Sequence, residues 1–356
     1  MRKYIAAVAL LLGVVFIISR MTEVKSIADT LKRGDLRYVF LALGLQALWL
    51  VNVALQYWTI YRELGIEAKL SRLIQISVAA DFVNIVTPSA GMGGMAVFIA
   101  EAQRDGHSAG RVTVAGVLFV LFDYLAFFCV LALGLGVLLR RNNLTSSEVI
   151  ATGVLIIITS VMAFLTYQGM RSERALANAL SWIINHVNRL LRPLIRRDYL
   201  SEEHAIDFAH EAADGLRELR QKPRNLITPF VVALIGKLLL VLILWLVFLA
   251  FQVPYSPGTI IGGWSIGYLF LIVSPTPAGL GVVEGALALA LTSLNVPLGA
   301  AAVITLAYRG ITYWMPLLVG IIAFRWLSHA GQPQLPVVSS INEPQSGSGQ
   351  TGMREK

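Results

Sequence analysis

Charged residues are scarce in this sequence of 356 residues. Asp, Glu, Lys and Arg make up 14% of it, and 56% is hydrophobic. About a quarter of a soluble domain is charged, so this composition excludes an ordinary soluble protein and indicates a polytopic membrane protein. The single cysteine, Cys129, excludes an internal disulfide and suits a small apolar core residue. The net charge of +8 does not indicate nucleic-acid binding, because the basic residues lie in loops, where membrane topology explains them.

Catalytic and metal-binding motifs are also missing. The sequence has no Walker A motif, no Rossmann glycine fingerprint and no nucleophile elbow. The five histidines form neither an HExxH motif nor a Cys/His metal spacing; they are His107, His186, His204, His210 and His329. We therefore expect a protein that is not an enzyme and that has no metal site and no cofactor.

Long apolar runs dominate what is present. Spanning a bilayer takes about 20 residues, and the clear candidates are 37–60, 112–139, 149–168, 226–251 and 300–325, with a weaker one at 4–19, read as an uncleaved first helix. Two further runs, 73–103 and 260–293, are interrupted at Thr87–Gly94 (TPSAGMGG) and Ser274–Gly281 (SPTPAGLG). Their arms are too short to span comfortably and suit re-entrant hairpins. The predicted fold class is an all-α polytopic membrane protein with about six full spans plus two broken hairpins.

The distribution of charge orients these segments. The connector 169–224 is rich in arginine and the flanks of the first hairpin are basic, so both are placed in the cytoplasm. The flanks of the second hairpin, 252–259 and 294–299, carry no charge and are placed outside. Segment 20–37 is basic but lies outside if 4–19 spans the membrane, and this weakens the assignment of basic segments to the cytoplasm. The sequence thus predicts an inverted repeat of helix–re-entrant hairpin–helix units, 37–139 and 226–325, a pattern typical of transporters.

The predicted domain organisation is simple. Residues 1–330 form the integral membrane domain, in which the connector 169–224 has the apolar periodicity of amphipathic helices on the inner membrane surface. Residues 331–356, rich in Pro, Gln, Ser and Gly, are predicted to be a disordered cytoplasmic tail. Both termini are expected in the cytoplasm.

Few ionisable residues fall inside the predicted spans and hairpins. They are Asp81, Asp123, Lys237, Glu284 and Arg309, with Glu101 near a hairpin end. A charge in mid-membrane costs at least about 2.5–3.5 kcal/mol, so such residues face a protein interior or a wet cavity and are paired. One interpretation is salt bridging that only fixes the bundle. Another is a pair of half-sites, with Glu284 and Arg309 in the second repeat and Asp123 in the equivalent helix of the first.

The two Gly/Pro loops allow the same two interpretations, close helix packing or a binding site. At a hairpin tip the second arm begins with free N–H groups at its positive end, where an anion can bind. Glu284 competes for that end, and whether it caps the arm, pairs with Arg309 or titrates stays open. The candidate substrate-binding or gating residues are Thr87, Gly91, Gly93, Asp123, Pro277, Gly279, Gly281, Glu284 and Arg309.

Two motifs carry a resemblance to a known family. They are GMGGMAVFIAEAQRDGHSAGR followed by VLFDYLAFF, and SPTPAGLGVVEGALALAL followed by AYRGITYWMPLLVG. Over roughly residues 1–330, the chain resembles the lysylphosphatidylglycerol synthase transmembrane (flippase-like) family, whose best-known member is the N-terminal flippase half of the multiple peptide resistance factor. The resemblance implies a plasma-membrane protein of a bacterium or archaeon that moves lipids between leaflets. It does not imply lysyl transfer, because no aminoacyl-transferase domain follows.

The leading hypothesis is therefore a translocator of a phospholipid or lipid-linked amphiphile with a charged headgroup, acting between the two hairpins. An alternative is a membrane partner that presents lipid to a separate enzyme without transporting it. A further alternative is a secondary transporter of a small anion. The expected partner is a membrane lipid, with no nucleic acid, and association into a homo-oligomer is left open.

Overall fold

The computed structural model describes residues 21–86, 92–142, 144–182, 223–274 and 276–320, together with positions 212, 216 and 219. Every regular element in these ranges is a helix, which confirms the all-α class. The predicted span 4–19 and the predicted tail 331–356 lie outside the described residues, as does most of the connector.

Five of the described helices are long and apolar enough to cross a membrane. Their positions agree closely with the five clear sequence predictions. They are α3 (Leu36–Glu63), α6 (Ala109–Arg140), α7 (Ser146–Arg171), α10 (Ile227–Ala250, preceded by η1, Pro223–Leu226), and α13 (Leu298–Arg309), which continues through the π-helical turn η3 (Gly310–Trp314) to Gly320. The amphipathic helix α2 (Met21–Arg33) precedes them.

The two interrupted runs fold as helical hairpins. In the first, α4 (Leu70–Val86) packs against α5 (Met92–Arg104). In the second, α11 (Pro257–Val273) packs against α12 (Val282–Ser293), and the short 3₁₀ turn η2 (Pro277–Gly279) lies between them. With 17 and 13 residues, and 17 and 12, the arms are shorter than a span.

Local sequence signals set the helix boundaries. The side chains of Asp35 and Ser256 accept hydrogen bonds from backbone N–H groups in the first turns of α3 and α11. The Glu148 carboxylate accepts a hydrogen bond from Thr145 N at the start of α7. These side chains satisfy N–H groups that an isolated helix start leaves unpaired. Gly65 and Gly106, which flank the first hairpin, adopt positive φ angles of 65° and 80°.

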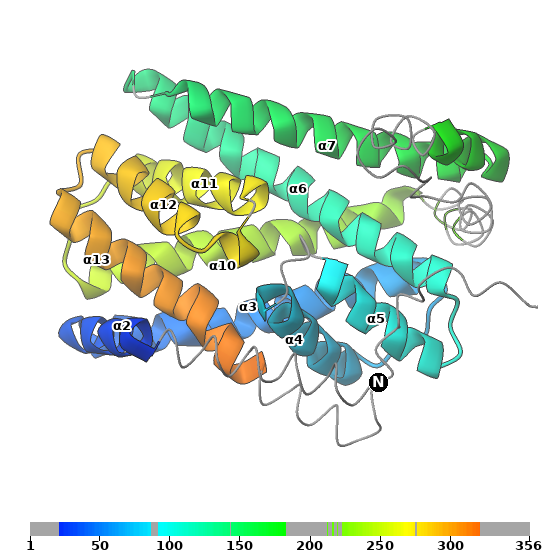
Figure 1. The fold of residues 1–356 in the computed structure, drawn as a ribbon, viewed down its shortest axis with the longest axis horizontal. Coiled ribbons are helices and arrows are strands. Elements are labelled where there is room, and N and C mark those ends of the chain that lie inside the picture. The colour runs from blue at the N-terminus through cyan, green and yellow to red at the C-terminus, as the bar shows by residue number, and fades with distance from the viewer. Residues whose placement is uncertain are drawn as a thin grey trace, which may run out of the picture.

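Helices α3 and α10 run antiparallel along the length of the molecule (Figure 1). At one end Asp35 N donates to Ala250 O at 2.8 Å, and at the other Asn225 Nδ2 donates to Glu63 Oε2 at 2.7 Å. The first helices of the two predicted repeats therefore have opposite directions, which is the arrangement that an inverted repeat requires.

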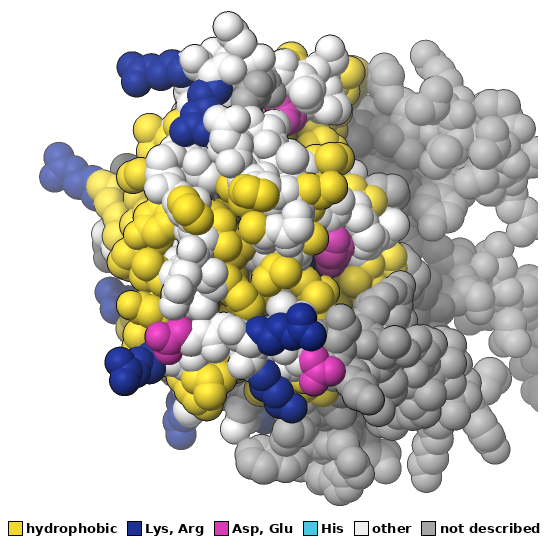
Figure 2. Space-filling model, turned by 90° about the vertical axis from the view of Figure 1, so that its left-hand side faces the viewer, with side chains coloured by type: hydrophobic (Ala, Val, Ile, Leu, Met, Phe, Trp, Pro, Cys, Tyr) yellow, Lys and Arg dark blue, Asp and Glu magenta, His cyan; other side chains and the backbone are white. Residues whose placement is uncertain are grey.

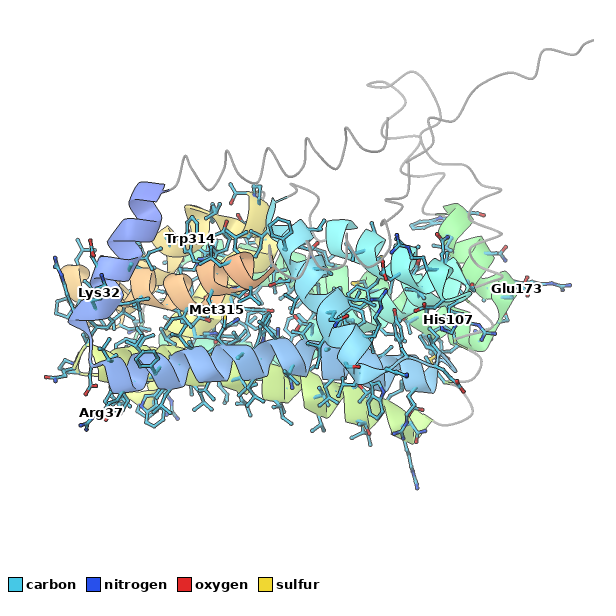
Figure 3. All side chains as sticks on the ribbon, turned by 90° about the horizontal axis from the view of Figure 1, so that it is seen from below. Lys32, Arg37, His107, Glu173, Trp314 and Met315 are labelled. Carbon is cyan, nitrogen blue, oxygen red and sulfur yellow. The ribbon has the colours of Figure 1, made fainter. Side chains whose placement is uncertain are left out.

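The two hairpins begin at opposite ends of the molecule. His107, at the base of the first hairpin, lies at the end opposite Lys32 and Arg37 (Figure 3). The base of the second hairpin is tied to the other end by Arg141, which donates to Leu294 O and to Ser256 Oγ, both at 3.1 Å. The hairpins meet at their tips: residues before the first tip, Phe82 and Ile85, share an apolar cluster with residues at the second, which include Ala278 and Leu280.

The surface is consistent with a membrane setting. Along α7, side chains such as Ile150, Ile157 and Phe164 are more than half exposed, as expected for a helix that faces lipid. Figure 2 looks onto one end of the bundle, where Lys, Arg, Asp and Glu side chains are scattered among apolar and uncharged ones.

The described connector positions pack against the rest of the protein. Leu176, Leu216 and Leu219 are buried in the same apolar cluster as the first hairpin. A Cβ added to Gly169 would overlap Leu216, which shows how closely this part of the connector approaches the end of α7.

Candidate functional site

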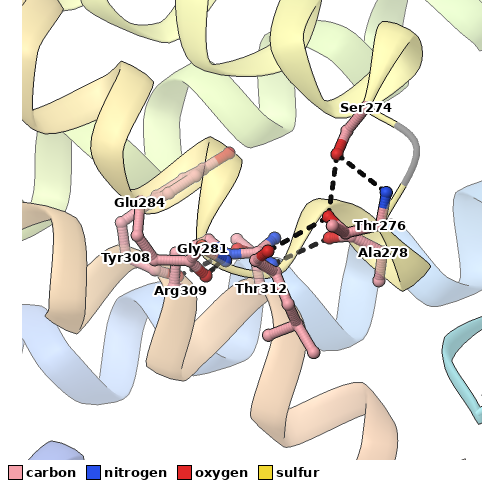
Figure 4. A network of polar contacts seen from close by, with 9 residues as sticks. Ser274, Thr276, Ala278, Gly281, Glu284, Tyr308, Arg309 and Thr312 are labelled. Atoms are coloured by element: carbon pink, nitrogen blue, oxygen red, sulfur yellow. Dashed lines mark hydrogen bonds and ion pairs between the residues drawn. The ribbon is translucent and has the colours of Figure 1, made fainter.

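The tip of the second hairpin is a compact, strongly bent loop (Figure 4). Ala278, Gly279 and Gly281 adopt positive φ angles of 48°, 71° and 79°. Hydrogen bonds from the Thr276 side chain stabilise this bend, because its hydroxyl donates to Leu280 O at 3.0 Å and pairs with Ser274 Oγ at 2.8 Å. Pro277 begins the 3₁₀ turn, a position that its fixed φ favours.

The structure brings Glu284 and Arg309 into the ion pair that the sequence suggested. Arg309 Nε donates to Glu284 Oε1 at 2.7 Å, with the arginine side chain 6% exposed and the glutamate 31% exposed. Arg309 Nη2 also donates to Ala278 O at 2.9 Å, and the guanidinium lies 4.7 Å from the centre of the Tyr313 ring. One buried cation thus connects α12, the η2 turn and η3.

Three N–H groups at the tip are already satisfied. Gly281 N donates to Glu284 Oε2 at 2.7 Å, so the carboxylate of the same helix takes the position in which an anion would bind. The N–H groups of Gly279 and Leu280 are also satisfied, by the carbonyls of Thr276 and Pro277. Glu284 therefore caps the arm and pairs with Arg309 at the same time.

The two glycines of this tip have different surroundings. A Cβ on Gly279 would overlap the side chain of Val283, so this glycine is needed for close packing as well as for its backbone angle. A Cβ on Gly281 would meet nothing within 4 Å, although the φ of 79° still disfavours a side chain. Of these two glycines, only Gly281 has open space at the position that a Cβ would take.

The corresponding loop of the first hairpin is described only in part. Thr87 and Gly91 lie outside the described residues, and Gly93 lies in the first turn of α5. The neighbouring Gly94 donates its N–H to Asn84 Oδ1 at 2.6 Å, and a Cβ there would overlap the Asn84 side chain. Gly94 therefore permits close contact between the two arms, which is the packing role weighed for these loops.

Asp123 lines the same cavity as Arg309 but forms its ion pair with another base. Its partner is Lys237 on α10, whose Nζ donates to Asp123 Oδ1 at 2.5 Å. Tyr268 on α11 donates its hydroxyl to Asp123 Oδ2 at 3.1 Å, and Lys237 also donates to that hydroxyl. Asp123, in the first repeat, is thus neutralised by a lysine of the second repeat that is 2% exposed.

Sequence reasoning did not assign Lys237 and Tyr268 to the site. The available signal was that Lys237 and Arg309 are the only basic residues in the predicted spans away from their ends, so each of the two already required an acidic partner. Spacing could not identify the acid for Lys237, because α6 and α10 are more than a hundred residues apart in the chain.

A cavity of about 340 Å³ lies between the two halves of the molecule. Its wall includes polar side chains from the first half, among them Asn52, Gln56, Ser77, Asp81, Asn84 and Asp123, and from the second half Tyr268, Tyr308, Arg309 and Thr312. Trp49, Phe98, Phe119 and Trp264 contribute large apolar surface. A mixed wall of this kind suits a ligand with both polar and apolar parts.

Glu101, by contrast, lies away from this cavity. It is 2% exposed and pairs with Arg72 on α4 and with Arg104 on its own helix. The cluster joins the two arms near the base of the first hairpin, so its role is structural. Among the described residues, no group of three His, Cys, Asp or Glu side chains is placed to hold a metal ion.

Comparison with known proteins identifies the family. The profile described as "Lysylphosphatidylglycerol synthase TM region" matches residues 4–320. A UPF0104 membrane protein of Methanothermobacter thermautotrophicus is 23% identical over 342 residues, which cover 94% of this chain and 98% of the relative. A UPF0104 membrane protein of Methanocaldococcus jannaschii is 22% identical over 326 residues, which cover 89% of this chain and 94% of the relative. The chain therefore belongs to the lysylphosphatidylglycerol synthase transmembrane family.

Proposed function

We propose that this protein moves a lipid with a charged headgroup, a phospholipid or a lipid-linked amphiphile, between the two leaflets of a prokaryotic plasma membrane. The observation that carries the proposal is Arg309, a buried guanidinium that lines a cavity built from both halves of the molecule. Family membership and the five apolar helices support the membrane setting.

The physical problem for such a protein is the charge of the headgroup. A charge in the middle of the hydrocarbon costs several kcal/mol or more, and a cavity with polar walls lowers that barrier. Helix α12 has 12 residues, so it is about 18 Å long, close to half the roughly 30 Å thickness of the hydrocarbon core. Two such hairpins, one entering from each end, would bring their tips and the cavity near the depth where the barrier is highest.

Glu284 is the group that an anionic headgroup would displace. In the structure its two carboxylate oxygens accept from Arg309 Nε and from Gly281 N. A single movement of the partly exposed Glu284 side chain would therefore release two donors, a guanidinium and a helix N-terminal N–H. Phosphate groups bind both kinds of donor well. The bond from Arg309 Nη2 to Ala278 O would keep the guanidinium in place during the exchange.

Purified protein in liposomes provides the test. The vesicles contain a trace of phosphatidylglycerol labelled on its headgroup with a fluorophore that external dithionite bleaches, and the protected fraction is followed in time. The parent protein should bring protected label to the outer leaflet. Arg309→Ala should abolish this movement and Glu284→Gln should slow it, whereas Arg37→Ala, which removes an exposed arginine at one end of the molecule (Figure 3), should behave as the parent.

If the Arg309→Ala variant inserts correctly into the same vesicles and still moves labelled lipid at the rate of the parent protein, this role of the arginine is refuted. Two other functions give different results in the same system. A protein that only presents lipid to an enzyme would bind labelled lipid without changing its protected fraction. A small-anion transporter would release trapped phosphate in an Arg309-dependent way while the lipid label stays protected.

A further inference from the structure

Asp81 is, with Asp123, one of the two acids that line the central cavity, and it has no part in the exchange at Arg309. It lies on α4, just over one turn before the tip of the first hairpin, and lines the cavity together with Ser77 and Asn84. The spacing of 77, 81 and 84 places these three polar side chains on one face of the helix. The first hairpin therefore presents a polar stripe to the cavity.

Arg309, which lines the cavity, and Lys237, which is paired with the cavity residue Asp123, are both already engaged. Arg309 binds Glu284 and the Ala278 carbonyl, and Lys237 binds Asp123 and Tyr268. Within the described part of the chain, Asp81 has neither an ion pair nor a hydrogen bond, and the buried hydroxyl of Ser77 also lacks a hydrogen-bond partner. Two acid–base pairs cancel, so Asp81 leaves the described cavity wall one acid in excess.

A carboxylate without a partner in a poorly solvated cavity needs a neutralising cation. A quaternary ammonium group, which has no N–H to donate, binds best to open aromatic faces, but Phe98 and Phe119 stack on Tyr57 at centroid distances of 3.9 and 4.2 Å. Trp264 stacks on Tyr268, which also faces Lys237. The described residues include no cluster of acidic, His or Cys ligands for a metal ion. A proton needs none of these partners, because it binds a carboxylate oxygen directly.

The surroundings of Asp81 contain no other acid without a base. Neither α5 nor η2 contributes a titratable side chain to the cavity wall. The titratable or charged groups that line the cavity with Asp81 are Tyr57 from α3, Asp123 from α6, Tyr268 from α11, and Tyr308 and Arg309 from α13. Asp123 and Arg309 are paired, and the Tyr308 hydroxyl accepts from Trp264 Nε1 at 3.0 Å.

We propose that Asp81 takes up one proton whenever an anionic headgroup enters the cavity and releases it at the opposite face, so that lipid and proton move together. This rests on the proposed function and adds its source of energy. An anionic headgroup and an ionised Asp81 would be two uncompensated negative charges in one cavity, which a low dielectric makes unfavourable. Protonation of Asp81 removes that repulsion, and deprotonation after release restores the empty state.

Vesicles with an imposed pH difference and a clamped membrane potential test this coupling. They contain the same labelled phosphatidylglycerol, and the readout is its final ratio between leaflets. At one proton per lipid, a difference of one pH unit sets a limiting ratio of about tenfold, because one pH unit is 1.36 kcal/mol. Label should accumulate in the leaflet on the alkaline side, and reversal of the gradient should reverse it. Asp81→Asn should give a ratio near one, Asp81→Glu should keep the asymmetry, and Asp29→Asn, at an exposed position on α2, should match the parent.

The outcomes separate the inference from the proposed function. If the parent moves lipid but ignores the gradient, or if Asp81→Asn still concentrates label, proton coupling is wrong and lipid movement stands. If the parent protein moves no lipid, both the proposed function and the proton coupling are wrong. Should Asp81→Asn fail to insert, a pH-sensitive dye inside parent vesicles decides the question: lipid movement without an accompanying flow of protons overturns the proposal.

Discussion

Removal of the negative charge at Asp123 should destabilise the folded protein strongly, because it leaves Lys237 charged and buried. Lys237 is 2% exposed and its Nζ lies 2.5 Å from Asp123 Oδ1, whereas Asp123 is 19% exposed. Loss of one partner of a buried pair costs about 3–5 kcal/mol. Asp123→Asn keeps the shape of the side chain and one oxygen acceptor, so we expect the lower end, about 3 kcal/mol, or on the order of a hundredfold in the folding equilibrium.

The double variant is the decisive control. Asp123→Asn combined with Lys237→Met removes both charges while keeping a side chain of similar length at position 237. Since replacement of a buried ion pair by neutral groups of similar volume is often close to neutral, stability should return to within about 1 kcal/mol of the parent. Tyr268→Phe, which removes only a hydroxyl, should cost about 1 kcal/mol.

These differences can be measured by unfolding in mixed micelles with increasing sodium dodecyl sulfate, followed by tryptophan fluorescence. The single variant should unfold at a clearly lower detergent fraction than the parent, with the double variant between them and near the parent. Two results would refute the reasoning: Asp123→Asn as stable as the parent, or a double variant less stable than Asp123→Asn alone.

Three further expectations follow from the structure. On a cysteine-free background, cysteines at positions 67 and 255 should react with an impermeant thiol reagent from opposite faces of the membrane, because the two hairpin bases lie at opposite ends; reaction from one face would contradict the inverted arrangement. Gly279→Ala should destabilise more than Gly281→Ala, since only the former meets a side chain, and equal losses in micelle unfolding would show that backbone angle alone matters. Glu101→Gln should lower stability by about 2 kcal/mol without changing the Arg309-dependent lipid assay, and a selective loss of transport would show that this cluster is more than structural.

The sequence alone determined the membrane class, the five long helices and the two broken hairpins. Long apolar runs have no stable alternative to helix in a bilayer, since every backbone polar group must be satisfied within the segment. The Pro/Gly-rich interruptions at 87–94 and 274–281 could be predicted because each divides an apolar run into two arms that are too short to span a bilayer. The pairing of Glu284 with Arg309 could also be predicted, because the two residues lie on neighbouring segments and are the only acid and base in the second hairpin and the helix that follows it.

Only the tertiary structure decided which groups of distant segments meet. Asp123 and Lys237 are 114 residues apart, and nothing in local spacing distinguishes Lys237 from Arg309 as the partner of Asp123. The antiparallel contact of α3 with α10 fixes that choice by bringing α6 and α10 together within the bundle. In the same packing Arg309 pairs with Glu284 and Lys237 pairs with Asp123, so Asp81 is left without a base among the described residues. This difference depends on three-dimensional neighbours and could not be predicted from local spacing in the sequence.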